Sequence, residues 1–312
     1  RDRLKRAIDD NTELRKKEKD DLIFSTLEQW PSDIRSKREG DPNGARPCLT
    51  IDQINQYIVQ VVNDIRQNRP SVKVRPVDDN ADIKTAEVFQ GLIRHIEDQS
   101  VAQIAYMTAA ESAVRVGEGY FRFITEYEND ESFNQVIKIR RCQDMFSVYL
   151  GPHMMPDGSD AEWGFIFEDY PEEVFRRMYP DAKYHQTDFD ELEDFRSYWN
   201  TEKKIRVAEY FYFDYQDSDL HYTEDGKTVL DDAYIKQEDK SAISKTRKTR
   251  KRTVKWCKLT GIEILDERDW AGKYIPIVKV TGKESFVDGK LVLWGLVRPA
   301  KDTLRMYNYV AS

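Results

Sequence analysis

Apolar residues recur at helical spacing over the first third of the chain. Over residues 4–30 they lie three, four or seven positions apart around a highly charged centre, which places them on one face of a helix. Trp30-Pro31 predicts the end of this helix, because the residue before a proline is pushed out of the α region. A loop rich in glycine and proline is predicted at residues 39–47.

A second helix is predicted to begin at Thr50. Thr50 and Gln53 have the spacing of a capping box, in which each side chain satisfies a free backbone N–H of the first turn. The helix is predicted to end before Pro70, and residues 71–76 alternate like a short strand. Its apolar stripe consists of Ile51, Ile54, Ile58, Val61, Val62 and Ile65.

Residues 81–116 predict two further helices, or one helix that is broken near residues 98–100. Small residues at helical spacing in the second part predict close packing. Gly117 is suited to end this part, because glycine adopts a positive φ at little cost. We therefore interpret Gly117-Glu118-Gly119 as a helix cap and a turn, and not as a dinucleotide-binding loop.

After Gly119 the period of the apolar pattern changes from helical to alternating, which predicts strands joined by polar turns. Residues 171–179 predict a short helix, because proline and acidic side chains favour its first turn. A last helix is predicted from Gly295 onwards. Strands are predicted at residues 120–127, 135–141, 146–150, 163–168 and 204–215, and a meander at 253–260, 262–266 and 275–280.

Helices first, then strands, then one helix is the order of an α+β protein and not of a doubly wound α/β fold. We expect N-terminal helices packed on a mostly antiparallel sheet, with residues 1–117 helical and residues 118–290 rich in sheet. The 312 residues are enough for one large or two ordinary domains. Because the chain begins without Met and its last residues continue a helical pattern, we expect it to be a piece of a longer protein.

The composition excludes some classes of protein. A hydrophobic content of 39% argues against global disorder, and a net charge of −8 argues against a protein that grips DNA over its whole surface. No apolar run approaches the roughly 20 residues that span a bilayer, and the first residues do not form a signal peptide. Cys48, Cys142 and Cys257 are far apart, which predicts reduced thiols.

The sequence contains none of the common catalytic motifs. Thr281-Gly282-Lys283-Glu284 is not a P-loop, because a glutamate replaces the hydroxyl residue and the upstream glycine is missing. There is no nucleophile elbow and no HExxH motif. The four histidines have no second His or Cys at ligand spacing. We therefore expect no catalytic residues, no cofactor and no bound metal.

Acidic residues leave a metal-dependent nuclease or phosphohydrolase open as an alternative. It would use carboxylates such as Asp157, Asp160 and Glu168, since such groups bind hard cations. An Asx turn at Asp157 is the favoured interpretation. Glu172 and Glu173 are explained by the first turn of a helix.

The most pronounced charge feature is a basic run with no acid between Lys240 and Lys255, after a stretch at residues 217–235 that we interpret as an acidic loop or weak hairpin. Three interpretations stay open: contact with DNA phosphates, docking on the acidic residues 157–232 of a neighbouring subunit, or a solvated arm. The run lacks the interleaved aromatic residues of a single-strand binder. The candidate contact residues are Lys245, Arg247, Lys248, Arg250, Lys251 and Arg252.

Several segments, in order along the chain, resemble the portal proteins of short-tailed double-stranded-DNA phages. No single motif is diagnostic, because these proteins have no catalytic signature, but the collinear set spans nearly the whole chain and matches least well over residues 181–250. The segments are Trp30-Pro31, Arg46-Pro47-Cys48-Leu49-Thr50, the helix from Asn55 to Pro70, Val72–Pro76, Ala113–Arg122, Asp157–Trp163, Asp269-Trp270 with Tyr274–Val278, and Gly295–Arg298 with Asp302 and Tyr307-Asn308.

The resemblance implies a non-enzymatic subunit of a ring, usually of twelve copies, at one vertex of a capsid. It implies packaging and ejection of double-stranded DNA through the ring, with terminase, scaffolding protein, coat protein and tail adaptors as partners. It places the protein in the virion and, during assembly, in the host cytoplasm. Residues 1–290 would form the wing domain and residues 291–312 the start of the stem helix. A basic-arm DNA-binding adaptor is a further alternative.

Overall fold

The computed structural model describes residues 2–42, 44–68, 72–76, 82–183, 199–201, 204–230 and 242–312. The chain divides into two compact units. The first comprises Arg1–Tyr149, His153–Ser159 and Pro276–Ser312, and the second comprises Leu150–Pro152 and Asp160–Ile275. Helices and antiparallel sheets are both present, which confirms the predicted α+β class.

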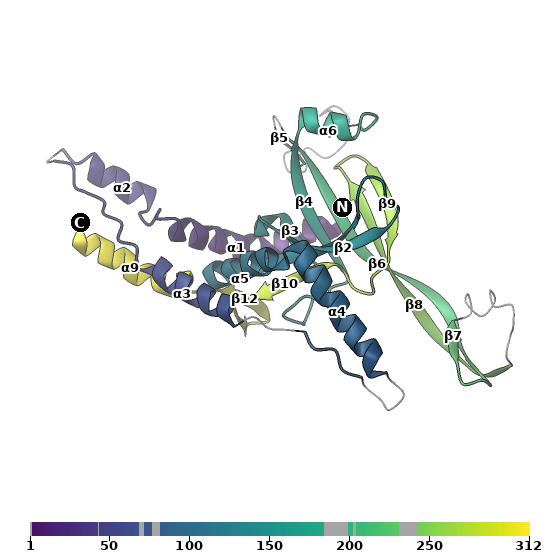
Figure 1. The fold of residues 1–312 in the computed structure, drawn as a ribbon. Helices are drawn as coiled ribbons and strands as arrows, with labels where there is room; N and C mark the ends of the chain where they lie inside the picture. The colour runs from purple at the N-terminus through teal and green to yellow at the C-terminus, as the bar shows by residue number, and fades with distance from the viewer. Residues whose placement is uncertain are drawn as a thin grey trace. The chain divides into compact units, whose positions relative to one another are not determined.

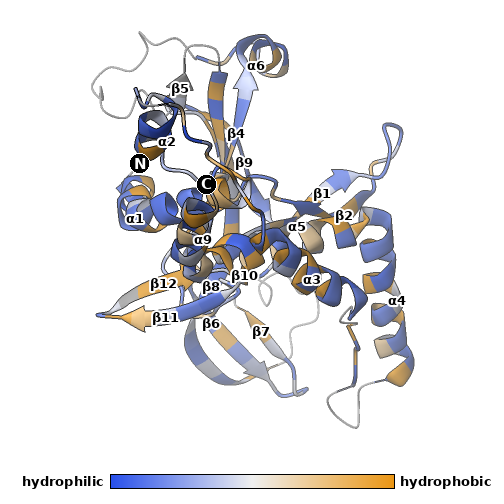
Figure 2. Ribbon diagram, turned by 90° about the vertical axis from the view of Figure 1, so that its left-hand side faces the viewer, coloured by the Kyte–Doolittle hydropathy of each residue, from blue (hydrophilic) through white to orange (hydrophobic). Residues whose placement is uncertain are grey.

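The helices of the first unit come from the N-terminal third of the chain and from its end. Figure 2 shows hydrophilic and hydrophobic residues mixed along α3, α4 and α9, as in amphipathic helices. The predicted break near residues 98–100 is confirmed, and it lies at Val101, which has a φ of 48°. The helices are α1 (Asp2–Ser25), α2 (Ser32–Glu39), α3 (Ile54–Gln67), α4 (Ile83–Ser100), α5 (Ala102–Val116) and α9 (Val297–Ala311) (Figure 1).

Three local predictions for this unit are wrong. Helix α3 begins at Ile54 and not at Thr50, and it is the carboxylate of Asp52 that accepts the N–H of Asn55, at 3.1 Å. Residues 72–76 are not a strand, because alternation makes a strand only where a neighbouring strand pairs with it. Helix α1 ends at Ser25 and not at Trp30, since Leu27 takes a φ of 73° outside the helical region, and Pro31 is instead the N-cap of α2, a helix that the sequence did not predict.

Two small antiparallel sheets complete the first unit. One has the order β10-β1-β2, from β1 (Glu118–Tyr127), β2 (Gln135–Arg141) and β10 (Ile277–Thr281). The other pairs β11 (Lys283–Val287) with β12 (Lys290–Trp294). We predicted β10 within a meander of its sequence neighbours, and this is wrong, since β10 pairs with β1. Pairing over such a distance along the chain is not encoded in local alternation.

Helix α5 packs closely on β1, as its small residues predicted. Ala105, Ala109 and Ala113 are buried. A Cβ atom on Gly119 would lie 2.1 Å from the carbonyl oxygen of Ala109, so only glycine fits there. Gly117 has a φ of 121° and ends α5 as predicted.

The main apolar cluster of the first unit joins α1, α3 and α9. Of the predicted stripe on α3, Ile54, Ile58 and Val62 are buried, whereas Val61 and Ile65 are exposed. The helix is therefore buried along a narrower face than the sequence predicted. The cluster consists of Phe24, Ile54, Ile58, Val62, Val297 and Leu304.

The longest antiparallel sheet has the order β3-β4-β6-β8-β9, and its strands from β4 to β9 lie in the second unit. Helix α6 (Glu172–Met178) contributes Phe175 to an apolar cluster with Ile205 and Val207. The predicted strand at 146–150 starts only at Val148, after the 3-10 helix η1 (Met145–Ser147). The strands are β3 (Val148–Leu150), β4 (Trp163–Pro171), β5 (Asn200–Thr201), β6 (Lys204–Thr223), β7 (Thr228–Leu230), β8 (Ile243–Leu259) and β9 (Ile264–Trp270).

Candidate basic interaction arm

Strands β6 and β8 continue beyond the rest of their sheet. Strand β4 pairs with β6 only as far as Tyr212, and β9 pairs with β8 only from Val254. Further out the two long strands pair with each other, and β7 joins β6 from Leu220 (Figure 1). We call residues 213–223 and 243–253, with β7, the arm. Of the two interpretations of residues 217–235, the loop is wrong for residues 217–223, because they continue β6 as a partner of the basic strand. The weak hairpin is confirmed over the described residues, since Leu220–Tyr222 pair with β7.

The candidate residues Lys245, Arg247, Lys248, Arg250, Lys251 and Arg252 all lie on β8 within the arm. Successive side chains of a strand point to opposite faces, and directly opposed residues of two paired strands share a face. Alternation therefore separates the six cations into two groups of three. Lys240, the first residue of the basic run, lies outside the described residues.

On one face, which we call the paired face, two of the three cations stand directly opposite an aspartate, and one of these two forms an ion pair. Lys248 is opposite Asp219 and Arg250 is opposite Asp217. The Arg250 Nε lies 3.1 Å from the Asp217 Oδ1, although both side chains are largely exposed, so this ion pair contributes at most about 1 kcal/mol. Arg252 lies over the ring of Phe213, 4.2 Å from its centroid. This face is therefore close to neutral.

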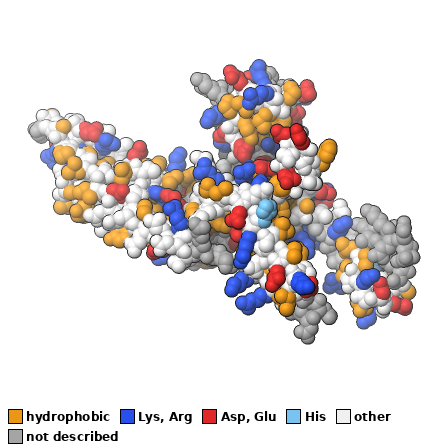
Figure 3. All heavy atoms as spheres, viewed as in Figure 1, with side chains coloured by type: hydrophobic (Ala, Val, Ile, Leu, Met, Phe, Trp, Pro, Cys, Tyr) orange, Lys and Arg blue, Asp and Glu red, His pale blue; other side chains and the backbone are white. Residues whose placement is uncertain are grey.

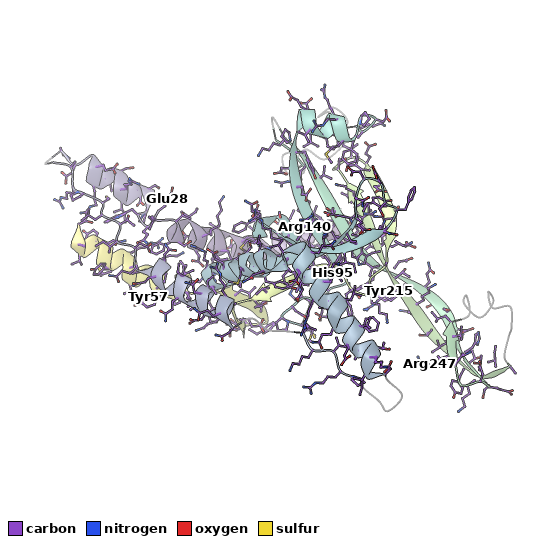
Figure 4. The ribbon with its side chains drawn as sticks, in the orientation of Figure 1. Glu28, Tyr57, His95, Arg140, Tyr215 and Arg247 are labelled. Carbon is purple, nitrogen blue, oxygen red and sulfur yellow. The ribbon has the colours of Figure 1, made fainter. Side chains whose placement is uncertain are left out.

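On the other face, which we call the open face, the basic residues stand opposite uncharged ones. Lys245 is opposite Tyr222, Arg247 is opposite Leu220, and Lys251 is opposite Gln216. The side chains of Lys245 and Arg247 are exposed and form no ion pair within the described part of the chain. The open face therefore combines positive charge with aromatic and apolar side chains. Figure 4 labels Arg247 towards the far end of the arm and Tyr215 closer to the sheet.

Two of the three acidic residues named for the nuclease alternative, Asp157 and Glu168, have structural explanations. The Asp157 Oδ1 accepts the N–H of Ser159 at 3.1 Å, which is the favoured Asx turn. The Glu168 carboxylate accepts the Tyr170 hydroxyl, and Glu172 pairs with Arg176 within α6 at 2.5 Å. Among the described residues no group of three or more His, Cys, Asp or Glu is placed to hold a metal ion.

A buried charge cluster in the first unit was not predicted. Arg15 of α1 lies 2.9 Å from the Glu118 carboxylate of β1, and Lys279 of β10 lies 3.2 Å from its other oxygen. Glu18 is fully buried, 3.7 Å from Arg15, and neither of its carboxylate oxygens has a hydrogen-bond partner among the described residues. Nothing local distinguishes Arg15 and Glu18 from the solvated charges of α1, so the sequence contained no signal for this cluster.

The cluster shifts the two glutamates in opposite directions. Burial, together with the charge of Glu118, raises the pKa of Glu18 to about 8. For Glu118, burial acts to raise the pKa, but Arg15 and Lys279 outweigh it and bring the pKa below its ordinary value. At neutral pH the cluster therefore holds one carboxylate between two cations, with Glu18 largely protonated beside it.

Helix α9 is attached to α1 by a second set of polar contacts. Asp21, with a side chain 1% exposed, lies 2.7 Å from Arg298 and 2.5 Å from Lys301. Near the end of α9, Asn308 donates to the Gln29 side chain at 2.6 Å in a buried hydrogen bond. These contacts hold α9 against α1 and the segment that follows it.

No helix in the described ranges is long and apolar enough to cross a bilayer.

Comparisons with known proteins agree on one family. The family model described as phage P22-like portal protein matches residues 1–312. The chain is also 27% identical over 285 residues to a portal protein of Acyrthosiphon pisum secondary endosymbiont phage 1. That match covers 85% of this chain but 39% of the relative, so the chain spans about two fifths of that relative's length.

Proposed function

Since the chain belongs to the P22-like portal protein family, we propose that it forms part of a ring subunit at one capsid vertex, through which double-stranded DNA is packaged and ejected. The observation that carries this proposal is the family match over every residue of the chain. The buried ion pairs and close α5–β1 packing support a rigid building block.

The proposed role is mechanical. A closed ring requires heterologous contacts, in which one surface of each copy meets a different surface of the next. A net charge of −8 suits a passage wall that repels phosphates and lets DNA slide. As for the family, we propose a structural protein that makes and breaks no covalent bonds and needs no cofactor.

The finer assignments are also proposals from the family. They are a ring of twelve copies, docking of terminase and tail adaptors, contacts with scaffolding and coat proteins, and a location in the virion after assembly in the host cytoplasm. Residues 1–290 would form the wing and residues 291–312 the start of the stem. The attachment of α9 to α1 supports a stem that leaves the wing in a fixed direction.

Electron microscopy of the complete protein that contains this sequence tests the proposal. We expect monodisperse rings with a central hole. A compact monomer at all concentrations contradicts it. Incubation with DNA and Mg²⁺ tests the nuclease alternative, with Asp160→Asn as its control; cleavage that is lost in this variant would replace the portal proposal.

A further inference from the structure

We propose that the open face of the arm binds the turn between β1 and β2 of a neighbouring copy of the chain. The inference rests on the proposed ring, because a contact between two different surfaces of identical chains is heterologous and can be repeated around a closed ring. Of the three interpretations of the basic run, contact between subunits is then the one that holds, with the β1–β2 turn as the partner surface.

The turn between β1 and β2 is acidic and carries an exposed aromatic ring. Glu128, Asp130 and Glu131 are exposed, and none of them forms an ion pair within the described part of the chain. Phe133, two positions further on, is 97% exposed. A phenylalanine in water is unfavourable, and its burial in a contact removes that cost.

Hydrogen bonds hold this turn in one conformation. The Glu128 N–H donates to the Asn134 carbonyl at 2.9 Å, and the Ser132 N–H to the Asn129 carbonyl at 3.2 Å. The Glu131 N–H donates to the Asn129 Oδ1 at 3.0 Å. Because the turn is already ordered, docking it loses little conformational entropy.

The open face offers the complementary chemistry. Lys245 and Arg247 supply positive charges that face no acid directly across the ladder. Tyr222, 45% exposed, and Leu220 lie beside them and supply apolar surface for an aromatic ring. Arg247 can also stack on Phe133, since guanidinium groups favour aromatic faces. Figure 3 shows Lys and Arg side chains beside hydrophobic ones towards the end of the arm, at the right of the view.

A second copy fits this face better than DNA does. The open face presents only a few cations, which gives few phosphate contacts and weak, strongly salt-dependent binding. Tyr222 and Leu220 have no apolar partner on a phosphate backbone. On the paired face of the same arm, Asp217 and Asp219 stand opposite Arg250 and Lys248, so that face adds little net positive charge for phosphates.

A pair of adjacent substitutions tests the face assignment in the complete protein. Arg247→Glu and Lys248→Glu make the same change of charge one residue apart, on opposite faces of β8. We expect Arg247→Glu to weaken association of the subunits about tenfold by sedimentation, and Lys248→Glu to change it less than about twofold. Both side chains are exposed, so circular dichroism should stay at wild-type values, and only Lys248→Glu should lower the unfolding midpoint slightly, because it places a second acid opposite Asp219.

A charge swap tests the identity of the partner surface. Glu131→Arg alone should weaken association as Arg247→Glu does, and the double variant Arg247→Glu/Glu131→Arg should restore it. Cysteines introduced at Leu220 and Ser132 should form a disulfide between two differently tagged copies. A bond only within one chain overturns the contact between copies.

Each remaining result has a distinct meaning. If the wild type forms no rings, the proposed function fails. If rings form and both Arg247→Glu and Glu131→Arg leave association unchanged, only the arm contact fails. If Arg247→Glu reduces DNA binding while association is unchanged, the open face belongs to DNA and the subunit contact is wrong.

Discussion

Glu18 and Glu118 show how strongly neighbours decide the state of a buried side chain. Both belong to the same cluster around Arg15, yet the pKa of one is raised and that of the other lowered. Glu118 lies within 3.2 Å of two cations, whereas Glu18 lies 3.7 Å from the nearer of them and accepts no hydrogen bond within the described residues. Two close cations therefore outweigh burial at Glu118, whereas at Glu18 burial and the charge of Glu118 prevail.

Glu18→Gln should remove a pH dependence of stability. The pKa of Glu18 rises from 4.5 to about 8 on folding, so the wild type loses stability as the pH increases between these values. The loss is on the order of a few kcal/mol, and glutamine, which stays neutral, avoids it. Urea unfolding of both proteins at pH 5, 7 and 9 measures the difference. Parallel pH profiles contradict the assignment.

Gly119→Ala should destabilise the first unit, because its Cβ would lie 2.1 Å from a backbone oxygen of α5 that cannot move aside alone. We expect a loss of about 2 kcal/mol or more. Gly91→Ala in α4 is the matched control, since its Cβ meets nothing within 4 Å and alanine favours a helix by up to about 1 kcal/mol. Thermal unfolding should show shifts of opposite sign, and equal shifts would argue against the close packing of α5 on β1.

At the scale of elements, α3 depends on a narrow buried face. Ile58 is 1% exposed, whereas its neighbour Val59 is 52% exposed. The same substitution at Ile58 and at Val59 therefore compares the effect on stability of a change in the core with that of a change on the surface of α3.

Ile58→Asp should abolish soluble folding, because a buried, unpaired carboxylate costs on the order of 4 kcal/mol or more. Val59→Asp should stay within about 1 kcal/mol of the wild type. Soluble yield and circular dichroism distinguish the two. Recovery of a well-folded Ile58→Asp protein would show that this face of α3 is not part of the core.

At the scale of the whole molecule, the positions of the charged side chains indicate possible binding partners better than the net charge does. The chain is acidic overall, yet six cations lie on one strand of the arm, where the register sets two of them opposite aspartates and four opposite uncharged residues. Such a surface is suited to binding an acidic segment of a neighbouring copy, whereas the net negative charge of two copies acts to keep them apart.

Association of the subunits should weaken as salt rises from about 50 to 500 mM, because exposed charges are screened over a shorter distance. The Arg247→Glu variant should associate weakly at every salt concentration and show a smaller dependence. Sedimentation over a salt series measures both slopes. Equal slopes for the two proteins mean that other charges carry the salt effect.

The sequence by itself determined the kinds of elements and most of their positions. The periods of 3.6 and 2 are local properties, so α4, α5, β1, β2 and α9 were placed to within two residues, and the start of α1 likewise. The same holds for Gly117, whose role as a cap depends only on its own backbone. Family resemblance came from collinear segments, which also need no tertiary structure.

Only the tertiary structure decided which residues meet. β10 pairs with β1, although the two strands are far apart in the chain. Glu18 is buried only because distant segments cover it. The register of β6 and β8 likewise sets Arg250 opposite Asp217 and Arg247 opposite Leu220. A basic run looks uniform in sequence, because alternation sorts its side chains only once a partner strand and a register exist. The two faces of the arm are therefore a property of the fold and not of the run.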